Sequence, residues 1–205
     1  MNGILMKHPS LNVAFPERKI FLRLGGNLSR TDCPEPERRK YMAVALKAFG
    51  LCRPAGRWMV LPVKSVGPDG IILEDGTEIP GGEFAGRCGG ITHLWMGAVT
   101  AGKALSDARD ALPLVSEQAV YDAVGAECAD CAMEVLQELS RQTMLRQALC
   151  LAERRFSPGY GDMPLTLQKF FFDRLKLEEL GMSLGTNMFM TPEKSVTAFA
   201  GVKPW

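Results

Sequence analysis

The chain has 205 residues, with 24 basic and 23 acidic side chains and a formal net charge of +1. This balance argues against nucleic acid as a partner, because a polyanion is held by a strong positive field. Hydrophobic residues make up 46% of the chain and charged residues 23%, which excludes a disordered protein.

The chain contains no apolar run near the length of about 20 residues that a membrane span requires, and its N-terminus lacks the apolar run of an export signal. We therefore expect a cytoplasmic protein without a membrane partner. The length allows one large domain or two small ones, and we expect one domain over residues 1–205.

The first predicted elements are a strand and a helix. Residues 19–24, K-I-F-L-R-L, alternate in polarity like a strand. A helix of about four turns should follow, because apolar residues then recur at helical spacing. Asp32 or Thr31 is the expected cap, and Gly50 is the expected stop.

A β-hairpin is predicted next. Residues 57–66 and 70–79 flank the turn Pro68-Asp69-Gly70, whose proline and glycine preset the backbone angles. The glycines of residues 81–90 could form a phosphate-binding loop, but they lack the order of either known glycine-rich phosphate motif. We therefore favour a structural loop.

Residues 91–100, I-T-H-L-W-M-G-A-V-T, are almost continuously apolar, which predicts a strand buried on both faces. His93 lies in this run, and we favour a hydrogen-bonded core histidine over a metal ligand, since metal sites need several ligands. A short helix is expected over residues 107–112.

The longest predicted helix covers Ser116 to about Cys150, with Ser116 as its cap. Gly125 in its interior costs about 1 kcal/mol relative to alanine, so another element should pack closely there.

Cys128 and Cys131 form a C-x-x-C pair inside this helix. One pair is half of a zinc or cluster site, and redox pairs begin a helix rather than lie within it. The six cysteines of the chain therefore favour reduced structural thiols, with no metal site.

The last third of the chain predicts one helix and two strands. Asp162 or Thr166 should cap a helix that ends at Leu180, and residues 182–191 and 195–202 should be strands. Mixed helices and strands joined by hairpin-type connections indicate an α+β fold.

Between the two long helices lies R-R-F-S-P-G-Y-G-D-M-P, residues 154–164. Its rigid turn can present the Arg155 guanidinium, backbone groups and the Tyr160 ring to one small ligand. The alternative is an ordinary tight turn with a surface arginine, which the residues by themselves favour.

Two separated motifs carry a resemblance to a known family. Arg155-Phe-Ser-Pro-Gly-Tyr160 and Met190-Thr-Pro-Glu-Lys-Ser-Val-Thr197, with the helix between them, resemble the activation domain of cobalamin-dependent methionine synthase. That domain has R-P-A-P-G-Y-P and M-W-P-x-A-S-V-S segments in the same order, so Thr191 stands where the family has tryptophan. The resemblance covers about the last fifty residues clearly.

The resemblance implies a fold, a ligand and a site. The fold is a single curved domain with a twisted antiparallel sheet and helices packed around it. The ligand is S-adenosylmethionine, whose carboxylate Arg155 would hold. Ser157 and Gly159 would offer backbone groups, Tyr160 would line the site, and Asp130 on the long helix would face the ligand, with Glu134 as the next candidate.

The resemblance also implies a function without catalytic residues of the chain's own. In the family, oxidised cobalamin is restored by an electron from flavodoxin or a similar donor, such as a ferredoxin, coupled to methyl transfer from S-adenosylmethionine. Reduced cobalamin is a strong nucleophile, and the sulfonium of S-adenosylmethionine is a good leaving group. The protein therefore need only orient the two molecules. The chain contains no cobalamin-binding D-x-H-x-x-G. We therefore expect it to act in trans on the cobalamin of a methionine synthase or another corrinoid protein.

Two alternatives stay open at this point. The chain could be a non-catalytic adaptor or chaperone that caps the cobalamin of a corrinoid protein. It could instead be a redox or metal protein that uses Cys128 and Cys131.

Overall fold

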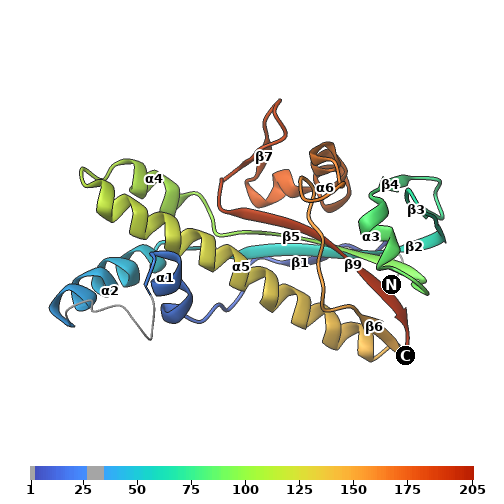
Figure 1. Ribbon diagram of the computed structural model, residues 1–205, viewed down its shortest axis with the longest axis horizontal. Coiled ribbons are helices and arrows are strands. Elements are labelled where there is room, and N and C mark those ends of the chain that lie inside the picture. The colour runs from blue at the N-terminus through green and yellow to red at the C-terminus, as the bar shows by residue number, and fades with distance from the viewer. Residues whose placement is uncertain (1–2, 27–34) are drawn as a thin grey trace.

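The computed structural model describes residues 3–26 and 35–205 (Figure 1). Its largest sheet has seven strands, all paired antiparallel, in the order β4-β3-β2-β5-β9-β6, with β1 also paired to β2. These strands are β1 (Met6–His8), β2 (Ala55–Val66), β3 (Gly70–Leu73), β4 (Glu78–Pro80), β5 (His93–Thr100), β6 (Leu149–Leu151) and β9 (Ser195–Pro204). A separate hairpin pairs β7 (Ser183–Leu184) with β8 (Met190–Thr191).

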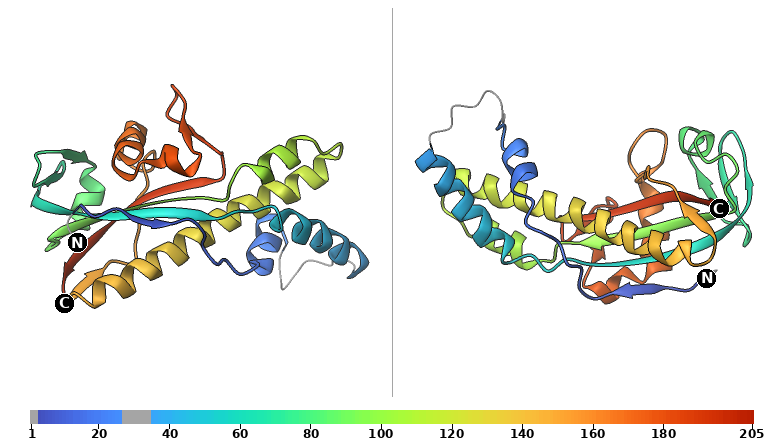
Figure 2. Two further views of the ribbon diagram at one scale, coloured as in Figure 1. Left: turned by 180° about the vertical axis from the view of Figure 1, so that it is seen from behind. Right: turned by 90° about the horizontal axis from the view of Figure 1, so that it is seen from below.

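The helices lie on both faces and at one end of this sheet (Figures 1 and 2). They are α1 (Glu17–Arg23), α2 (Glu35–Phe49), α3 (Gly82–Gly86), α4 (Ala104–Asp110), α5 (Val115–Leu145) and α6 (Gln168–Leu175), with 3-10 turns η1 (Leu165–Leu167) and η2 (Leu177–Leu180). The predicted α+β fold with a twisted antiparallel sheet is thus confirmed. Within the described residues, no helix has the length and apolar character to cross a membrane.

The central strands are buried on both faces, as the apolar run at 91–100 predicted. Alternate residues of β5 enter different cores: Met96 and Ala98 pack with α3 and α6, whereas Trp95 and Val99 pack with α5. Strands β2 and β9 divide their side chains in the same way. His93 begins β5 half-buried, and its Nδ1 lies 2.9 Å from the Thr92 hydroxyl.

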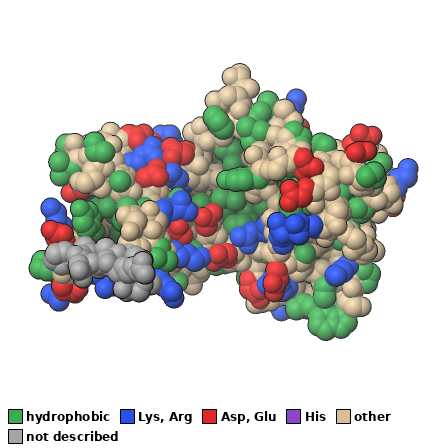
Figure 3. Space-filling view, viewed as in Figure 1, with side chains coloured by type: hydrophobic (Ala, Val, Ile, Leu, Met, Phe, Trp, Pro, Cys, Tyr) green, Lys and Arg blue, Asp and Glu red, His purple; other side chains and the backbone are tan. Residues whose placement is uncertain are grey.

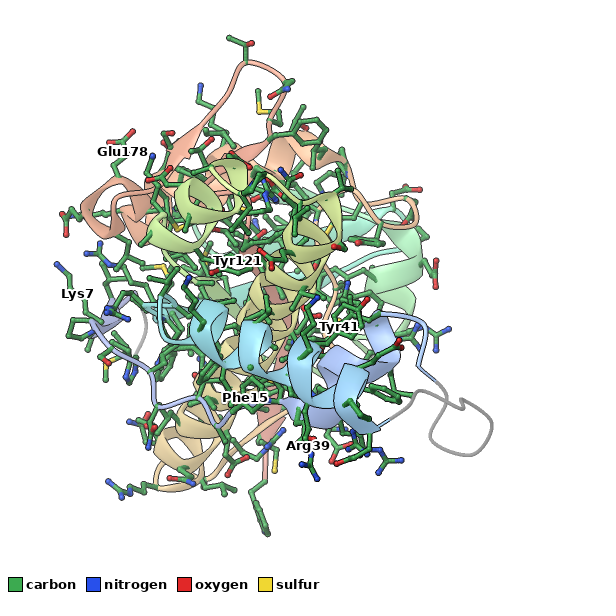
Figure 4. The ribbon with its side chains drawn as sticks, turned by 90° about the vertical axis from the view of Figure 1, so that its left-hand side faces the viewer. Lys7, Phe15, Arg39, Tyr41, Tyr121 and Glu178 are labelled. Carbon is green, nitrogen blue, oxygen red and sulfur yellow. The ribbon has the colours of Figure 1, made fainter. Side chains whose placement is uncertain are left out.

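Helix α5 is longer than the sheet. At about 1.5 Å per residue its 31 residues span roughly 45 Å. Its C-terminal half packs on the sheet, and its N-terminal half forms a third core with α1, α2 and α4. Phe15, labelled in Figure 4, lies in this helical end. Its ring meets that of Phe49 edge to face, with ring centroids 5.4 Å apart. The expected close packing at Gly125 is confirmed, because a Cβ there would lie 2.4 Å from Leu105 Cδ2.

Several local predictions were wrong at the N-terminal half. Residues 19–23 belong to helix α1 rather than a strand, with Leu24 at its C-cap position, and the helix buries Ile20 in the helical core. Helix α5 has Leu114 rather than Ser116 at its cap position and ends at Leu145, where the chain turns into β6. The predicted capping residues Asp32 and Thr31 lie outside the described residues.

The structure also differs from the predictions in the residues that come after helix α5. Neither Asp162 nor Thr166 caps α6, because Asp162 instead accepts a hydrogen bond from the Glu83 amide in the first turn of α3. The predicted helix to Leu180 is broken at Lys176, whose φ is 51°. The Lys176 carbonyl accepts a 2.7 Å hydrogen bond from Arg57, which is only 4% exposed in β2. The predicted strand 182–191 is the β7–β8 hairpin.

Gly97 provides a test of the sheet core. A Cβ at this position would lie 2.3 Å from a ring carbon of Trp95, which is fully buried and cannot move aside. We expect Gly97→Ala to lower the free energy of unfolding by about 1–3 kcal/mol, as overpacked cores do. Gly86→Ala is the matched control, because no atom lies within 4 Å of its Cβ position. Equal urea midpoints for both variants would contradict this packing.

Candidate functional site

A cleft of about 510 Å³ lies between α5, residues 153–160 and the start of β9. Four of the five predicted ligand-binding residues line it, namely Asp130, Arg155, Ser157 and Tyr160, and so does Glu134. Acidic and basic side chains lie interspersed along the middle of this face of the molecule (Figure 3). Residues that are distant in the sequence are therefore brought together, although their role in binding stays a prediction.

Gly159 is the predicted residue that does not line the cleft. It has φ +89°, in the left-handed region that favours glycine, and its amide donates a 2.9 Å hydrogen bond to the Met163 carbonyl. The Tyr160 amide donates to the Ser157 carbonyl at 3.2 Å. These bonds close the turn on itself, so Gly159 shapes the loop that carries Tyr160.

Residues 152–157 run beside β9 and direct their side chains alternately to two sides. Phe156 exchanges two backbone hydrogen bonds with Phe199, of 2.9 and 2.8 Å, and the Ala152 amide donates to Gly201 at 2.9 Å. Glu153, Arg155 and Ser157 consequently line the cleft. Ala152, Arg154 and Phe156 line a cavity on the other side.

Gln137 of α5 orients Arg155. Its side chain is only 3% exposed, and its oxygen accepts a hydrogen bond from the Arg155 guanidinium. Its amide nitrogen donates to the carbonyls of Ala152 and Glu153 at 2.7 and 3.1 Å. These bonds hold the Gln137 side chain in place and attach the backbone of residues 152–153 to α5. Because the buried Gln137 amide has partners for both its nitrogen and its oxygen, it can hold the Arg155 guanidinium in one orientation.

The acidic residues of the cleft meet basic residues from α1. Burial, followed by the nearby Glu127 carboxylate, raises the pKa of Asp130. Arg23 lies 3.3 Å from Asp130 and also pairs with Glu127, and Lys19 lies 2.8 Å from Glu134. Lys19 and Arg23 are four residues apart, the spacing that places both on one face of a helix.

The floor of the cleft contains a polar pair that the sequence analysis missed. Thr197 of β9 donates a 2.9 Å hydrogen bond to the side-chain oxygen of Gln168 in α6, and both residues are buried. Gln137, Lys19 and Arg23 were also missed. The sequence contained one signal for this contact. Lys19 and Arg23 are four residues apart, as are Asp130 and Glu134, so two helices could pair these side chains.

The two cysteines of the C-x-x-C pair face different neighbours. Cys128 is buried beside Cys52, and the interaction of the two thiols lowers the pKa of Cys52 and raises that of Cys128. Cys131 instead lies 3.5 Å from the Lys19 ammonium. Within residues 3–26 and 35–205, no group of three or more histidine, cysteine or acidic side chains could hold a metal.

Comparisons with known proteins show a likeness at the level of the fold. No family model matches the sequence, and no curated protein matches it. The chain is similar to the crystal structure of the MetH reactivation domain bound to AdoHcy, with a TM-score of 0.68 and 17% identity over 98% of this chain and 79% of that one. The likeness shows the fold.

An ion-pair network beside the cleft should make the stability of the folded protein depend on pH in the acid range. The carboxylate of Glu193, just before β9, pairs with Arg109 and Lys194 at 3.0 and 2.6 Å. The Arg109 hydrogen bond, followed by that of Lys194, lowers the pKa of Glu193 from 4.5 to about 2. Its contribution to stability is therefore present above the unfolded pKa and is lost as the pH falls through the folded pKa.

We expect Glu193→Gln to be less stable than the wild type at about pH 5, with the difference shrinking towards about pH 2. Thermal unfolding midpoints across this range measure it. The control is Glu178→Gln, because Glu178 is exposed on η2 and forms no ion pair within the described residues (Figure 4). A difference for Glu193→Gln that does not change with pH would contradict the network.

Proposed function

We propose that this protein binds S-adenosylmethionine in the cleft and supports reductive methylation of cobalamin carried by a separate methionine synthase or related corrinoid protein. The observation that carries the proposal is the position of Arg155, which enters the cleft opposite Asp130 and is oriented by the buried Gln137. The fold-level likeness to the MetH reactivation domain, which was solved with AdoHcy, supports the same ligand class.

The residues of the cleft fit this ligand by their chemistry. A guanidinium suits the carboxylate of an amino acid, and Asp130 and Glu134 suit its ammonium and sulfonium charges. Ser157 and Thr197 offer hydroxyl groups for a ribose, and Tyr160 offers an aromatic face. The volume of about 510 Å³ lies within the roughly 300–1,000 Å³ of small-molecule sites.

When bound, the ligand would supply the methyl group, and a flavodoxin or ferredoxin would supply the electron. This chain would bind the ligand, orient it and exclude water. The rim of the cleft suits a protein partner, because Tyr160 is 77% exposed and Phe189, beside the cleft residue Met190, is 64% exposed. Large exposed apolar side chains around a site are typical of docking surfaces.

One observation favours the adaptor as a second candidate. Asp130 and Glu134 already pair with Arg23 and Lys19, so the two carboxylates of α5 in the cleft are neutralised without a ligand. Among the acidic residues of the cleft that the structure describes, Glu153 has no ion-pair partner. A protein that only caps the cobalamin of its partner would need few free carboxylates there.

Calorimetric titration with S-adenosylmethionine tests the proposal. We expect saturable binding, weakened about 10- to 100-fold in Arg155→Met, because a charge-assisted hydrogen bond to a carboxylate is lost. Gln137→Leu should weaken binding to a smaller extent, since Arg155 keeps its charge and loses its orientation.

The matched control is Arg39→Met, which removes the same charge from the exposed outer side of α2 (Figure 4). It should bind like the wild type. If folded wild-type protein binds no ligand, either by itself or with a cobalamin protein present, the adaptor function is favoured instead.

A further inference from the structure

A second cavity, of about 390 Å³, lies on the other side of residues 152–157 from the cleft. Three cationic side chains from separate elements line it: Arg87 follows α3, Arg154 belongs to the segment beside β9, and Lys203 lies near the end of β9. Every charged residue in its lining is a cation. In a chain with a net charge of only +1, three such groups around one cavity are a local arrangement rather than a result of composition.

The positive charges of this cavity are poorly compensated. Arg87 has Glu83 as a partner, at 3.9 Å, and both side chains are more than half exposed. Within the described residues, no carboxylate pairs with Arg154 or Lys203. The Arg154 guanidinium instead lies over the Phe156 ring, 5.1 Å from its centroid, which restricts its direction.

The backbone at Gly89 is the open part of the cavity floor. No atom lies within 4 Å of a Cβ at Gly89, so this backbone is accessible to a compact ligand. Gly201 is instead covered, because a Cβ there would lie 2.8 Å from Ile91 Cγ2 and 3.7 Å from the Cys88 sulfur. Burial raises the pKa of Cys88 to about 11, and its neutral thiol adds no negative charge at neutral pH.

We propose that this cavity is a binding site for a small, multiply charged oxyanion, either inorganic phosphate or the phosphate group of a metabolite. Arginine and lysine together match such a group, because guanidinium groups bind its oxygens in pairs and an ammonium adds a point charge. The site does not depend on the function proposed for the cleft, since Arg155 and Asp130 are absent from its lining.

Titration with inorganic phosphate and with glycerol 3-phosphate at constant ionic strength tests the site. The readout is the shift of the backbone amide NMR signals of Gly89 and Gly201, with calorimetry for affinity. We expect saturable binding, weakened about tenfold or more in Arg154→Met and in Lys203→Met. Tighter binding of the ester assigns the site to a phosphorylated metabolite, and equal binding assigns it to free phosphate.

Arg39→Met is again the matched control, because it removes one positive charge on α2, at the other end of the molecule from β6 and α3 (Figure 1). It should bind phosphate like the wild type. The proposal is overturned if wild-type protein shows no saturation up to about 10 mM, or if Arg39→Met loses as much affinity as Lys203→Met. Because the titrants are phosphates, failure of S-adenosylmethionine binding would not affect this result.

Discussion

The outer edge of β9 is the constraint on which both cavities depend. Strand β6 pairs with only its last residues, Val202–Pro204, and an unpaired strand edge leaves donors and acceptors that need partners. Residues 152–157 supply partners at Gly201 and Phe199. Once that backbone is fixed, the alternation of side chains sends Arg155 to one side and Arg154 to the other. Two neighbouring arginines thus line two different cavities, and both also border a third cavity beside Glu83 and Asp162.

The charges around the cleft act as a connected set rather than as single pairs. Helix α1 brings Lys19 and Arg23 to Glu134 and Asp130 of α5. On the same helix, Gln137 accepts a hydrogen bond from Arg155, which lies on the other wall of the cleft. The individual exposed pairs contribute little to stability because solvent screens them. If the cleft binds the proposed zwitterionic ligand, its cationic group would compete with Arg23 for Asp130. Its carboxylate would meet Arg155, which is hydrogen-bonded to the neutral Gln137 side chain.

Local signals predicted those elements whose causes are local. The hairpin follows from Pro68-Asp69-Gly70, and the buried strand at 91–100 follows from its continuous apolar run. The motif around Arg155 predicted three residues of the cleft, Arg155, Ser157 and Tyr160, whereas Asp130 was predicted from the family resemblance. By contrast, α1 is helical because Ile20 packs into a core with residues of α4 and α5, which are distant in the sequence. The break at Lys176 likewise depends on Arg57, and the role of Gln137 depends on where residues 152–153 return. Such tertiary contacts leave no periodic pattern in the sequence.

Helix α5 belongs to two cores, and this has a consequence for how the molecule comes apart. Val124 and Cys128 are buried among the helices, and Met133 and Leu136 are buried against the sheet, with no loop between them. Opening of either core exposes apolar surface on the same continuous helix. Local unfolding usually occurs in cooperative units that pack separately, whereas here the helical core and the sheet core share helix α5. Asp130 lies on α5 between Cys128 of the helical core and Met133 of the sheet core, so this part of the cleft wall is fixed where the two cores meet.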